Sequence, residues 1–333
     1  MRKFTIGIPT FNRAGYLRKS LASALAQTLD DVEILVSDNA STDETSDVVH
    51  QAGPRVRYLR NTTNVGMWPN FEKLVEAAEG EYFSFLQDDD LIHCDFARRA
   101  FEAFSTDKDA SVYAAYAVGA PSHTALWFPF LYGPPVALDW SLGTRRYLDG
   151  KVIAPLSLFI SFAIPPAIAF RRESLCRAMR LCDPACELYN ERIILSAAAA
   201  EGKVAVEPYV AAIWLAHSQQ ACKLTGQVDS RAFQSQWLRM ANVICPFLES
   251  SGEAWKSQLH NALNEVAIPY RREWMQQARG WQGAPPIAYQ AAEILKASLN
   301  ESGVAPNSAL KEWARDLTPP FLWRFVRQYM RGS

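Results

Sequence analysis

The first hundred residues alternate apolar runs with segments that are apolar on one side only. Strands are predicted at 4–8, 31–38, 56–61 and 81–87, and helices at 14–27, 41–53 and 70–80. The helix at 41–53 opens with Ser, Thr and acidic residues, which favour a helix start, and the helix at 70–80 ends at Gly80. This alternation predicts an α/β fold in which helices flank a mostly parallel, Rossmann-like sheet.

Polar residues follow each of the four predicted strands. In a parallel sheet the binding crevice lies beyond the carboxyl ends of the strands, so we expect these residues to share one edge. They are Thr10 and Asn12, Asp38 and Asn39, Asn61 and Asn64, and Asp88 to Asp90.

The rest of the chain changes character twice. Residues 111–225 are less regular and carry aromatic and proline-rich pieces such as 126–136, whereas helical spacing returns at 230–248, 253–278, 286–302 and 308–317. The stretch 152–170 is uncharged over about the length of a membrane span. Because Pro155, Pro165 and Pro166 would interrupt a helix, short buried strands are favoured over a transmembrane helix.

Composition narrows the classes of partner. The 34 Lys and Arg residues nearly balance the 35 Asp and Glu residues, so the net charge of -1 gives no electrostatic footprint for nucleic acid. The six cysteines are scattered without paired spacings, which favours reduced thiols in a cytosolic protein. Residues 1–11 resemble a first strand rather than a signal peptide.

Three consecutive aspartates, Asp88 to Asp90, end the fourth predicted strand. Neighbouring carboxylates repel one another, so they need a cation or solvent to stay ionised. Hard divalent cations such as Mg²⁺ prefer oxygen ligands, typically one or two carboxylates together with substrate phosphates. The sequence therefore indicates a metal site at this strand end, with a solvated acidic turn that caps the next helix as the alternative.

Two long stretches carry a family resemblance. "IPTFNRAGYLRKSLASALAQTLDDVEILVSDNASTDET" and "NVGMWPNFEKLVEAAEGEYFSFLQDDDLI" resemble the nucleotide-sugar-binding half of family 2 glycosyltransferases of the GT-A fold, especially the abequosyltransferase-like subgroup. Beyond residue 110 the likeness is limited to "PPAIAFRRESL" and "NERIILSAAAAEGKVAVEP". The resemblance implies a nucleotide-sugar-binding half at 1–110, an acceptor-binding half at 111–225 and a C-terminal helical extension at 226–333.

The resemblance also implies a nucleotide pocket. Asp38 would accept a hydrogen bond from the base, although a turn-forming role for this residue is the alternative. Gly66 would let the backbone approach the nucleotide closely, and Asp88 would face the ribose. The residues implied for this pocket are Pro9, Thr10, Asn12, Asp38, Asn64, Gly66 and Asp88.

The implied cofactor is Mg²⁺ or Mn²⁺, which would bridge the diphosphate. Aligning "FLQDD" with the family's commoner "FLDAD" makes Asp89 the metal ligand and leaves Gln87 at the first Asp position, whereas the alternative register selects Asp90. His217 falls where relatives often place a histidine near the diphosphate or the metal. A structural role for this lone histidine is the alternative.

An inverting transfer also needs a general base for the acceptor hydroxyl. Family members carry it as the aspartate of an "ED" pair at a helix start, which here becomes Asn190–Glu191. Glu191 is therefore the candidate base and Glu187 the reserve candidate. Alternatively, Glu191 is a first-turn carboxylate that the helix dipole favours.

The resemblance implies transfer of a sugar from a nucleoside-diphosphate donor, UDP or dTDP, to a glycan or lipid-linked acceptor in bacterial surface polysaccharide synthesis. A sugar nucleotidyltransferase is a weaker alternative because "PTFNR" has no glycine before Gly15 for a phosphate loop. A non-catalytic scaffold is the third hypothesis. Residues 319–331 interleave aromatic side chains with arginines, which suits either a helix on the inner face of the cytoplasmic membrane or a helix packed on the C-terminal bundle.

Overall fold

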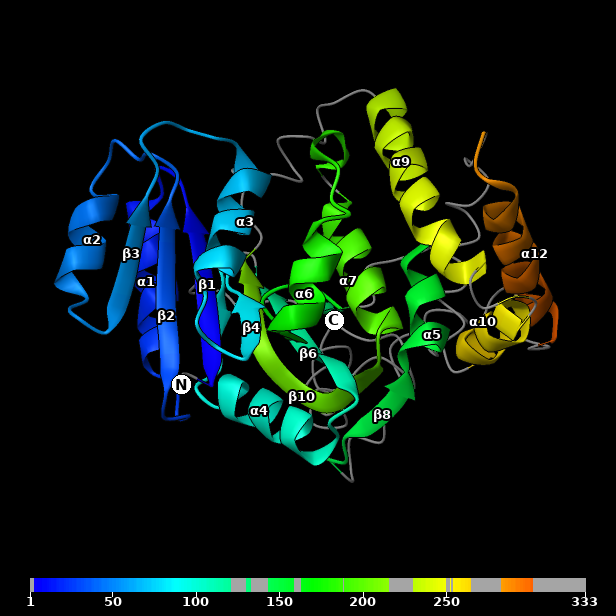
Figure 1. The fold of residues 1–333 in the computed structure, drawn as a ribbon. Helices are drawn as coiled ribbons and strands as arrows, with labels where there is room; N and C mark the ends of the chain where they lie inside the picture. Colours follow the sequence, from blue (N-terminus) through cyan, green and yellow to red (C-terminus); the bar gives the residue numbers. More distant parts are fainter. Residues whose placement is uncertain are drawn as a thin grey trace, which may run out of the picture.

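The computed structural model describes residues 3–120, 130–132, 143–158, 163–187, 189–215, 230–249, 252, 254–264 and 283–301. The first part of the chain forms the predicted alternation of strand and helix (Figure 1). Its strands are β1 (Phe4–Thr10), β2 (Val32–Asp38), β3 (Val56–Arg60) and β4 (Tyr82–Phe85). Its helices are α1 (Ala14–Leu25), α2 (Thr45–Gln51) and α3 (Met67–Ala77).

One sheet organises the described chain. Its strand order is β3-β2-β1-β4-β9-β6-β10-β5, with β7 pairing β6 and β8 pairing β10 at its margins. β1 pairs in parallel with β2 and β4, and β10 pairs in parallel with β6, whereas β9 runs antiparallel to both of its neighbours. The later strands are β5 (Leu91–Ile92), β6 (Ala110–Ala120), β7 (Phe130–Tyr132), β8 (Arg146–Asp149), β9 (Ile168–Arg171) and β10 (Lys203–Leu215).

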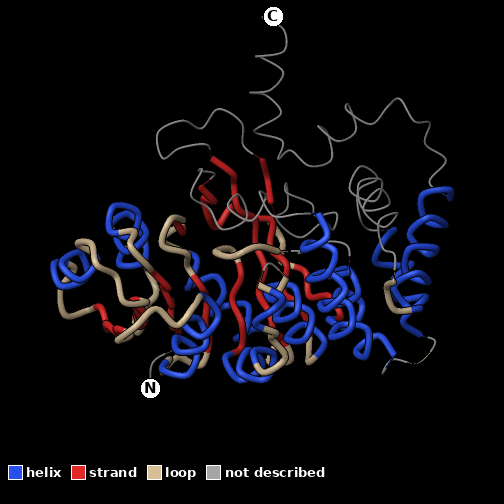
Figure 2. Tube along the Cα trace, turned by 90° about the horizontal axis from the view of Figure 1, so that it is seen from above, coloured by secondary structure: helices blue, strands red, loops and turns tan. Residues whose placement is uncertain are grey.

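Helices cover both faces of this sheet (Figure 2). The side chains of β6 alternate between two cores: Val112 and Ala114 pack in the core that holds α3, α6, α7 and α9, and Tyr113 packs in the core that holds α1 and α4. The remaining helices are α4 (Phe96–Thr106), α5 (Gly150–Ile153), η1 (Ala154–Leu158), α6 (Arg172–Met179), η2 (Pro184–Cys186), α7 (Asn190–Ala200), α9 (Ser230–Glu249), α10 (Ala254–Asn264) and α12 (Pro286–Glu301).

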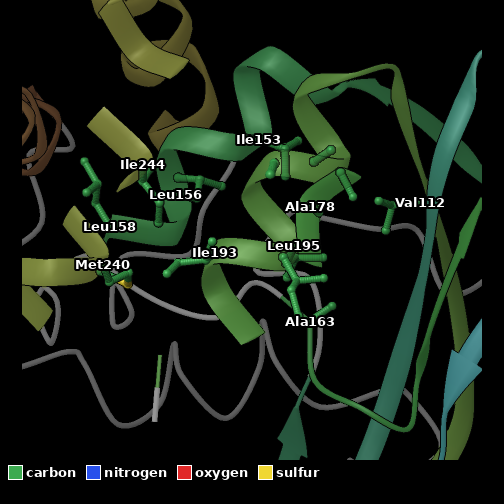
Figure 3. Packing of buried hydrophobic residues seen from close by; sticks show 14 of the residues in the cluster. Val112, Ile153, Leu156, Leu158, Ala163, Ala178, Ile193, Leu195, Met240 and Ile244 are labelled. Atoms are coloured by element: carbon green, nitrogen blue, oxygen red, sulfur yellow. The ribbon is translucent and has the colours of Figure 1, made fainter. Parts of the chain in front are cut away.

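The described C-terminal helices pack on the α7 side of the sheet, away from β3 (Figure 1). α9 contacts α7 and η1, α10 contacts α5 and η1, and α12 contacts α10 and α9. Figure 3 shows this core from close by, with Met240 and Ile244 of α9 beside Leu156, Leu158 and Ile193. The helices are therefore continuous with the main core. The predicted helix at 308–317 lies outside the described residues.

The apolar stretch 152–170 forms a different structure from the predicted strands. Its described parts are the end of α5, the short helix η1 and the start of β9, and Leu156 and Leu158 are fully buried in the α7-side core (Figure 3). The prediction of buried core is confirmed, but its strand content is limited to β9. None of the helices in the described part of the chain is both long and apolar enough to cross a bilayer.

The predicted ends of two helices need correction. α3 begins at Met67 and ends at Ala77, so Gly80 is not its terminus. A Cβ at Gly80 would lie 2.6 Å from the backbone nitrogen of Thr5, so glycine is needed for close approach to β1. α2 begins at Thr45, four residues later than predicted, because the side chain of Asp43 accepts the Thr45 N–H at 3.1 Å.

Candidate active site

The carboxyl ends of the parallel strands meet at one edge of the sheet, as predicted. Thr10 at the end of β1 pairs with Asp38 at the end of β2, which in turn pairs with Arg60 at the end of β3. A cleft of about 590 Å³ opens at this edge. The predicted site residues that line it are Pro9, Thr10, Asn64, Gly66, Asp88, Asp89, Asp90 and Glu191, together with the reserve candidate Glu187.

The acidic trio lies on the floor of the cleft. Asp88, Asp89 and Asp90 are only 5%, 6% and 1% exposed. Asp88 accepts a hydrogen bond from the Thr10 hydroxyl at 2.8 Å, which connects the ends of β4 and β1. Asp90 accepts the backbone N–H of Leu215 at 2.9 Å and so ties the trio to the end of β10. These hydrogen bonds direct Asp90 toward β10.

Burial of these carboxylates leaves their negative charge poorly solvated. Burial, and then the charge of Asp89, raises the pKa of Asp88 to about 7. The same two causes, in the same order, raise the pKa of Asp90. A group of oxygen ligands with raised pKa values at the floor of a cleft fits a hard divalent cation, because the cation would stabilise the ionised forms.

The trio is not a ready-made set of three metal ligands. Within the described residues, the one group of three or more His, Cys, Asp or Glu donor atoms that lie within 4.8 Å of one another is His93, Cys94 and Asp95, on a partly exposed loop. The side chain of Asp95 in this group already accepts a hydrogen bond from the Thr28 hydroxyl at 2.7 Å. A cation in the cleft would therefore use one or two of the aspartates and complete its shell with oxygens from a ligand.

Asp38 is placed behind the cleft rather than on its surface. Its side chain is fully buried. One carboxylate oxygen accepts the Ser41 N–H at 2.8 Å, and the other accepts the Tyr58 hydroxyl at 2.6 Å, with Arg60 Nε at 3.7 Å. Burial and the hydrogen bond to Asp38 raise the pKa of Tyr58 to about 12. The contacts of Asp38 are those of the turn-forming alternative.

Asn12 organises the loop between β1 and α1. Its φ of 52° is left-handed, a conformation that asparagine tolerates. Its backbone N–H donates to Ser41 Oγ at 2.8 Å, and its side-chain oxygen accepts the Thr42 N–H at 2.7 Å. Asn12 is exposed and does not belong to the residues that line the cleft, so it clamps two neighbouring loops together.

Asn39 lines the cleft where Asp38 does not. Its amide nitrogen donates to Asn64 Oδ1 at 2.8 Å and to the carbonyl of Gly66 at 3.0 Å. Its amide oxygen accepts the Val65 N–H at 2.9 Å and Asn61 Nδ2 at 3.0 Å. Asn39 thus holds the loop that carries Asn64 and Gly66. Its place next to Asp38 at a strand end was the sequence signal for it.

Gln87 and Arg13 also line the cleft. Gln87 Oε1 is buried and has no hydrogen-bond partner among the described residues, so a ligand with a donor group would satisfy it. Arg13 Nη1 donates to Asp88 at 3.2 Å and to Asp89 at 2.9 Å. No pattern in the sequence predicts that these two residues line the cleft beside the aspartates.

Glu191 brings a carboxylate to the cleft from α7, far from the aspartates in the sequence. It stands in the first turn of α7 and is half-buried. Burial raises its pKa to about 7, against the opposing effect of the neighbouring Arg192 guanidinium. Asn190 turns the other way, because its amide bonds both to the N–H of Asp183 at 3.0 Å and to its carbonyl at 2.9 Å.

Glu187 is exposed, and its backbone carbonyl accepts Trp68 Nε1 at 3.0 Å. Both candidate bases therefore share the cleft with the aspartates. His217 and residues 319–331, for which a ligand role and a membrane contact were predicted, lie outside the described residues.

A cleft at the carboxyl edge of a mostly parallel sheet, lined by buried aspartates, agrees with the predicted GT-A fold. The model of the family "Glycosyl transferase family 2" matches residues 5–175, just over half of the 333 residues. The chain belongs to this family. The structure is similar to that of S. aureus TarS in complex with UDP-GlcNAc, with a TM-score of 0.55 over 90% of this chain and 91% of that one at 14% identity.

Curated relatives match over the first part of the chain. A GalNAc(5)-diNAcBac-PP-undecaprenol beta-1,3-glucosyltransferase of Campylobacter jejuni is 39% identical over 95 residues, which are 27% of this chain and 30% of that protein. An uncharacterised glycosyltransferase of Rickettsia typhi is 31% identical over 126 residues, or 37% of this chain and 39% of that protein. The aligned part of the chain thus spans less than half the length of these relatives.

Proposed function

We propose that the protein is an inverting, metal-dependent glycosyltransferase that moves a sugar from a nucleoside-diphosphate donor to a glycan or lipid-linked acceptor. One observation carries this proposal: Glu191, with a pKa of about 7, lines the same cleft as the buried aspartates at the carboxyl edge of the sheet. A base and a diphosphate-binding floor are the two parts that such a transfer needs.

Different residues of the cleft would bind the nucleotide, hold the cation and act as the base. Thr10, Asn64 and Gly66 would bind the nucleotide, and Asp88 would face its ribose. Asp89 would hold Mg²⁺ or Mn²⁺, with Asp90 fixed behind it by Leu215. A bound cation would act as a Lewis acid that neutralises charge on the leaving nucleoside diphosphate. Glu191 would take the proton of the acceptor hydroxyl as that oxygen attacks the anomeric carbon.

The finer assignments rest on the sequence. We propose UDP or dTDP as the nucleotide, bacterial surface polysaccharide synthesis as the pathway, and membership of the abequosyltransferase-like subgroup. The Campylobacter relative is named for a lipid-linked acceptor, which supports an acceptor of that class. Such an acceptor would bring the enzyme to the inner face of the cytoplasmic membrane, where residues 319–331 would contribute a peripheral contact.

The assignment of the base is tested with two carboxylate-to-amide variants. Glu191→Gln keeps the shape of the side chain but removes its basicity, so donor hydrolysis with Mn²⁺ should fall by about 10²–10⁴-fold. Glu187→Gln, which also lines the cleft, is the matched control and should stay within about threefold of wild type. If Glu187→Gln is the inactive variant, Glu187 is the base. Unchanged hydrolysis in both variants would leave a donor-binding scaffold as the better explanation.

A further inference from the structure

Arg13 lies where the cleft floor meets the start of α1. It is the residue that precedes α1, and its side chain crosses to the strand end 75 residues later in the chain. A single nitrogen, Nη1, donates to both Asp88 Oδ1 at 3.2 Å and Asp89 Oδ2 at 2.9 Å. The Arg13 side chain is 25% exposed, whereas those of the two aspartates are 7% and 9% exposed. The guanidinium therefore enters from the solvent side of the pair.

This arrangement already supplies the two carboxylates with a counter-ion. Charge-assisted hydrogen bonds of this length are among the stronger contacts in a protein, and they stabilise two like charges that burial would otherwise disfavour. A divalent cation approaches carboxylate oxygens to about 2.0–2.6 Å, closer than the guanidinium nitrogen. The two cations would repel each other at that separation, so they would compete for Asp89 Oδ2.

We propose that Arg13 is a positioning residue that acts as an internal counter-ion: it holds Asp88 and Asp89 before a donor binds, and it has to leave Asp89 before a divalent cation can bind there. The proposal rests on the proposed function, in which Asp89 holds the cation. Arg13 lines the cleft, so the displaced guanidinium would remain beside the bound donor.

A measurable consequence is weak binding of the metal alone. The apparent dissociation constant is the intrinsic one divided by the fraction of molecules in which Asp89 is released. If Arg13 holds Asp89 in nine molecules out of ten, the affinity falls by about tenfold. A merely structural contact would have the opposite consequence, because its loss would loosen the site and weaken binding.

The test titrates Mn²⁺ alone into the full chain and measures free Mn²⁺ by electron paramagnetic resonance. Arg13→Gln should bind Mn²⁺ about tenfold more tightly than wild type. Arg18→Gln removes the same charge from an exposed position on α1 and should stay within about twofold. Adding Asp89→Asn to Arg13→Gln should abolish the gain. Thermal melting checks that each variant is folded.

The outcomes distinguish the proposed role of Arg13 from the proposed metal site at Asp89. If wild type binds Mn²⁺ through Asp89 and Arg13→Gln binds it equally or less tightly, the role of Arg13 is wrong and the metal site stands. If no variant binds Mn²⁺, Arg13 is not what keeps the cation from Asp89 and its proposed role is wrong, whereas the metal site itself is tested with nucleotide present. Should Arg13→Gln fail to fold, Arg13→Lys keeps the charge on a shorter side chain and should bind Mn²⁺ more tightly than wild type. Equal affinity for Arg13→Lys and wild type would then overturn the proposal.

Discussion

Ala40 follows the cleft-lining Asn39 and has a backbone φ of 67°. A Cβ is unfavourable in this left-handed region, at a cost of about 1–2 kcal/mol, which glycine does not incur. Glycine also loses more backbone entropy on folding, about 0.4–1 kcal/mol. Ala40 therefore adopts a backbone conformation that its own Cβ makes unfavourable.

Ala40→Gly should raise the free energy of unfolding by about 0.5–1 kcal/mol, because the strain that it relieves exceeds the added entropy cost. Urea denaturation measures the change. Ala22→Gly, at an exposed position inside α1, is the matched control and should lower stability by about 1 kcal/mol. A loss of stability in Ala40→Gly would show that the side chain makes a contact that outweighs its strain.

Glu191 sets the expected pH dependence of the reaction. A base acts in its ionised form, and burial raises the pKa of this carboxyl to about 7. The rate of donor hydrolysis at low substrate should therefore rise as pH increases toward 7 and level off above it. Arg192→Gln removes the opposing positive charge and should move this midpoint to higher pH. A rate that is constant from about pH 5.5 to 8.5 would contradict the role of Glu191.

The positions of some single residues could not be predicted from the sequence. Asp38 and Asn39 are adjacent polar residues at one strand end, and successive side chains of a strand point to opposite sides. The sequence pattern makes both residues equally good candidates for the cleft. Only the structure shows that Asp38 is buried behind the cleft and that Asn39 lines it. The contact of Arg13 with Asp88 and Asp89 joins distant parts of the chain, and no local pattern encodes it.

At the scale of elements, the first four strands were predicted more reliably than helix ends, whereas the long strands β6 and β10 were not predicted. The four apolar runs determined β1 to β4 because their residues fill both cores of the sheet. α3 starts earlier than predicted because Pro69 fits its first turn, where a backbone N–H has no helical partner. Asp43 starts two helices at once, since its carboxylate accepts the N–H of Ala14 as well as that of Thr45.

A buried charge cluster joins β10, α4 and β6. Glu207 of β10 is 4% exposed and accepts hydrogen bonds from Arg99 of α4 at 2.9 Å and from Tyr113 of β6 at 2.5 Å. Arg145 adds a contact at 3.2 Å. Burial, and then the charge of Glu207, raises the pKa of Tyr113, so the hydroxyl stays a donor. This cluster fixes β10, whose end supplies the backbone partner of Asp90.

Glu207→Gln should lower the free energy of unfolding by about 2–3 kcal/mol, because it leaves two arginines facing a neutral amide in a poorly solvated place. Chemical denaturation provides the measurement. The control is Glu173→Gln, which breaks an exposed pair with Arg177 and should cost less than about 0.5 kcal/mol. Similar losses in the two variants would mean that the cluster contributes no more than a surface ion pair.

At the scale of the whole molecule, the α/β class and the binding edge followed from the sequence. Parallel strands bring their carboxyl ends together whatever the details of packing, so Thr10, Asn64 and Asp88 could be placed in one cleft. Glu191 could not be placed there by periodicity, because α7 reaches the cleft through contacts between distant segments. Its assignment came from the family resemblance, and the structure brings it to the same cleft.

The most direct test of the account is a thermal-shift panel of UDP, dTDP, GDP and CDP, each with and without Mn²⁺, on wild type and Asp89→Asn. A ligand that binds the native state raises its melting temperature by mass action. The account predicts that at least one nucleotide stabilises wild type much more with Mn²⁺ than without it, and that Asp89→Asn loses this difference. Stabilisation that is equal with and without Mn²⁺, or equal in wild type and Asp89→Asn, would contradict it.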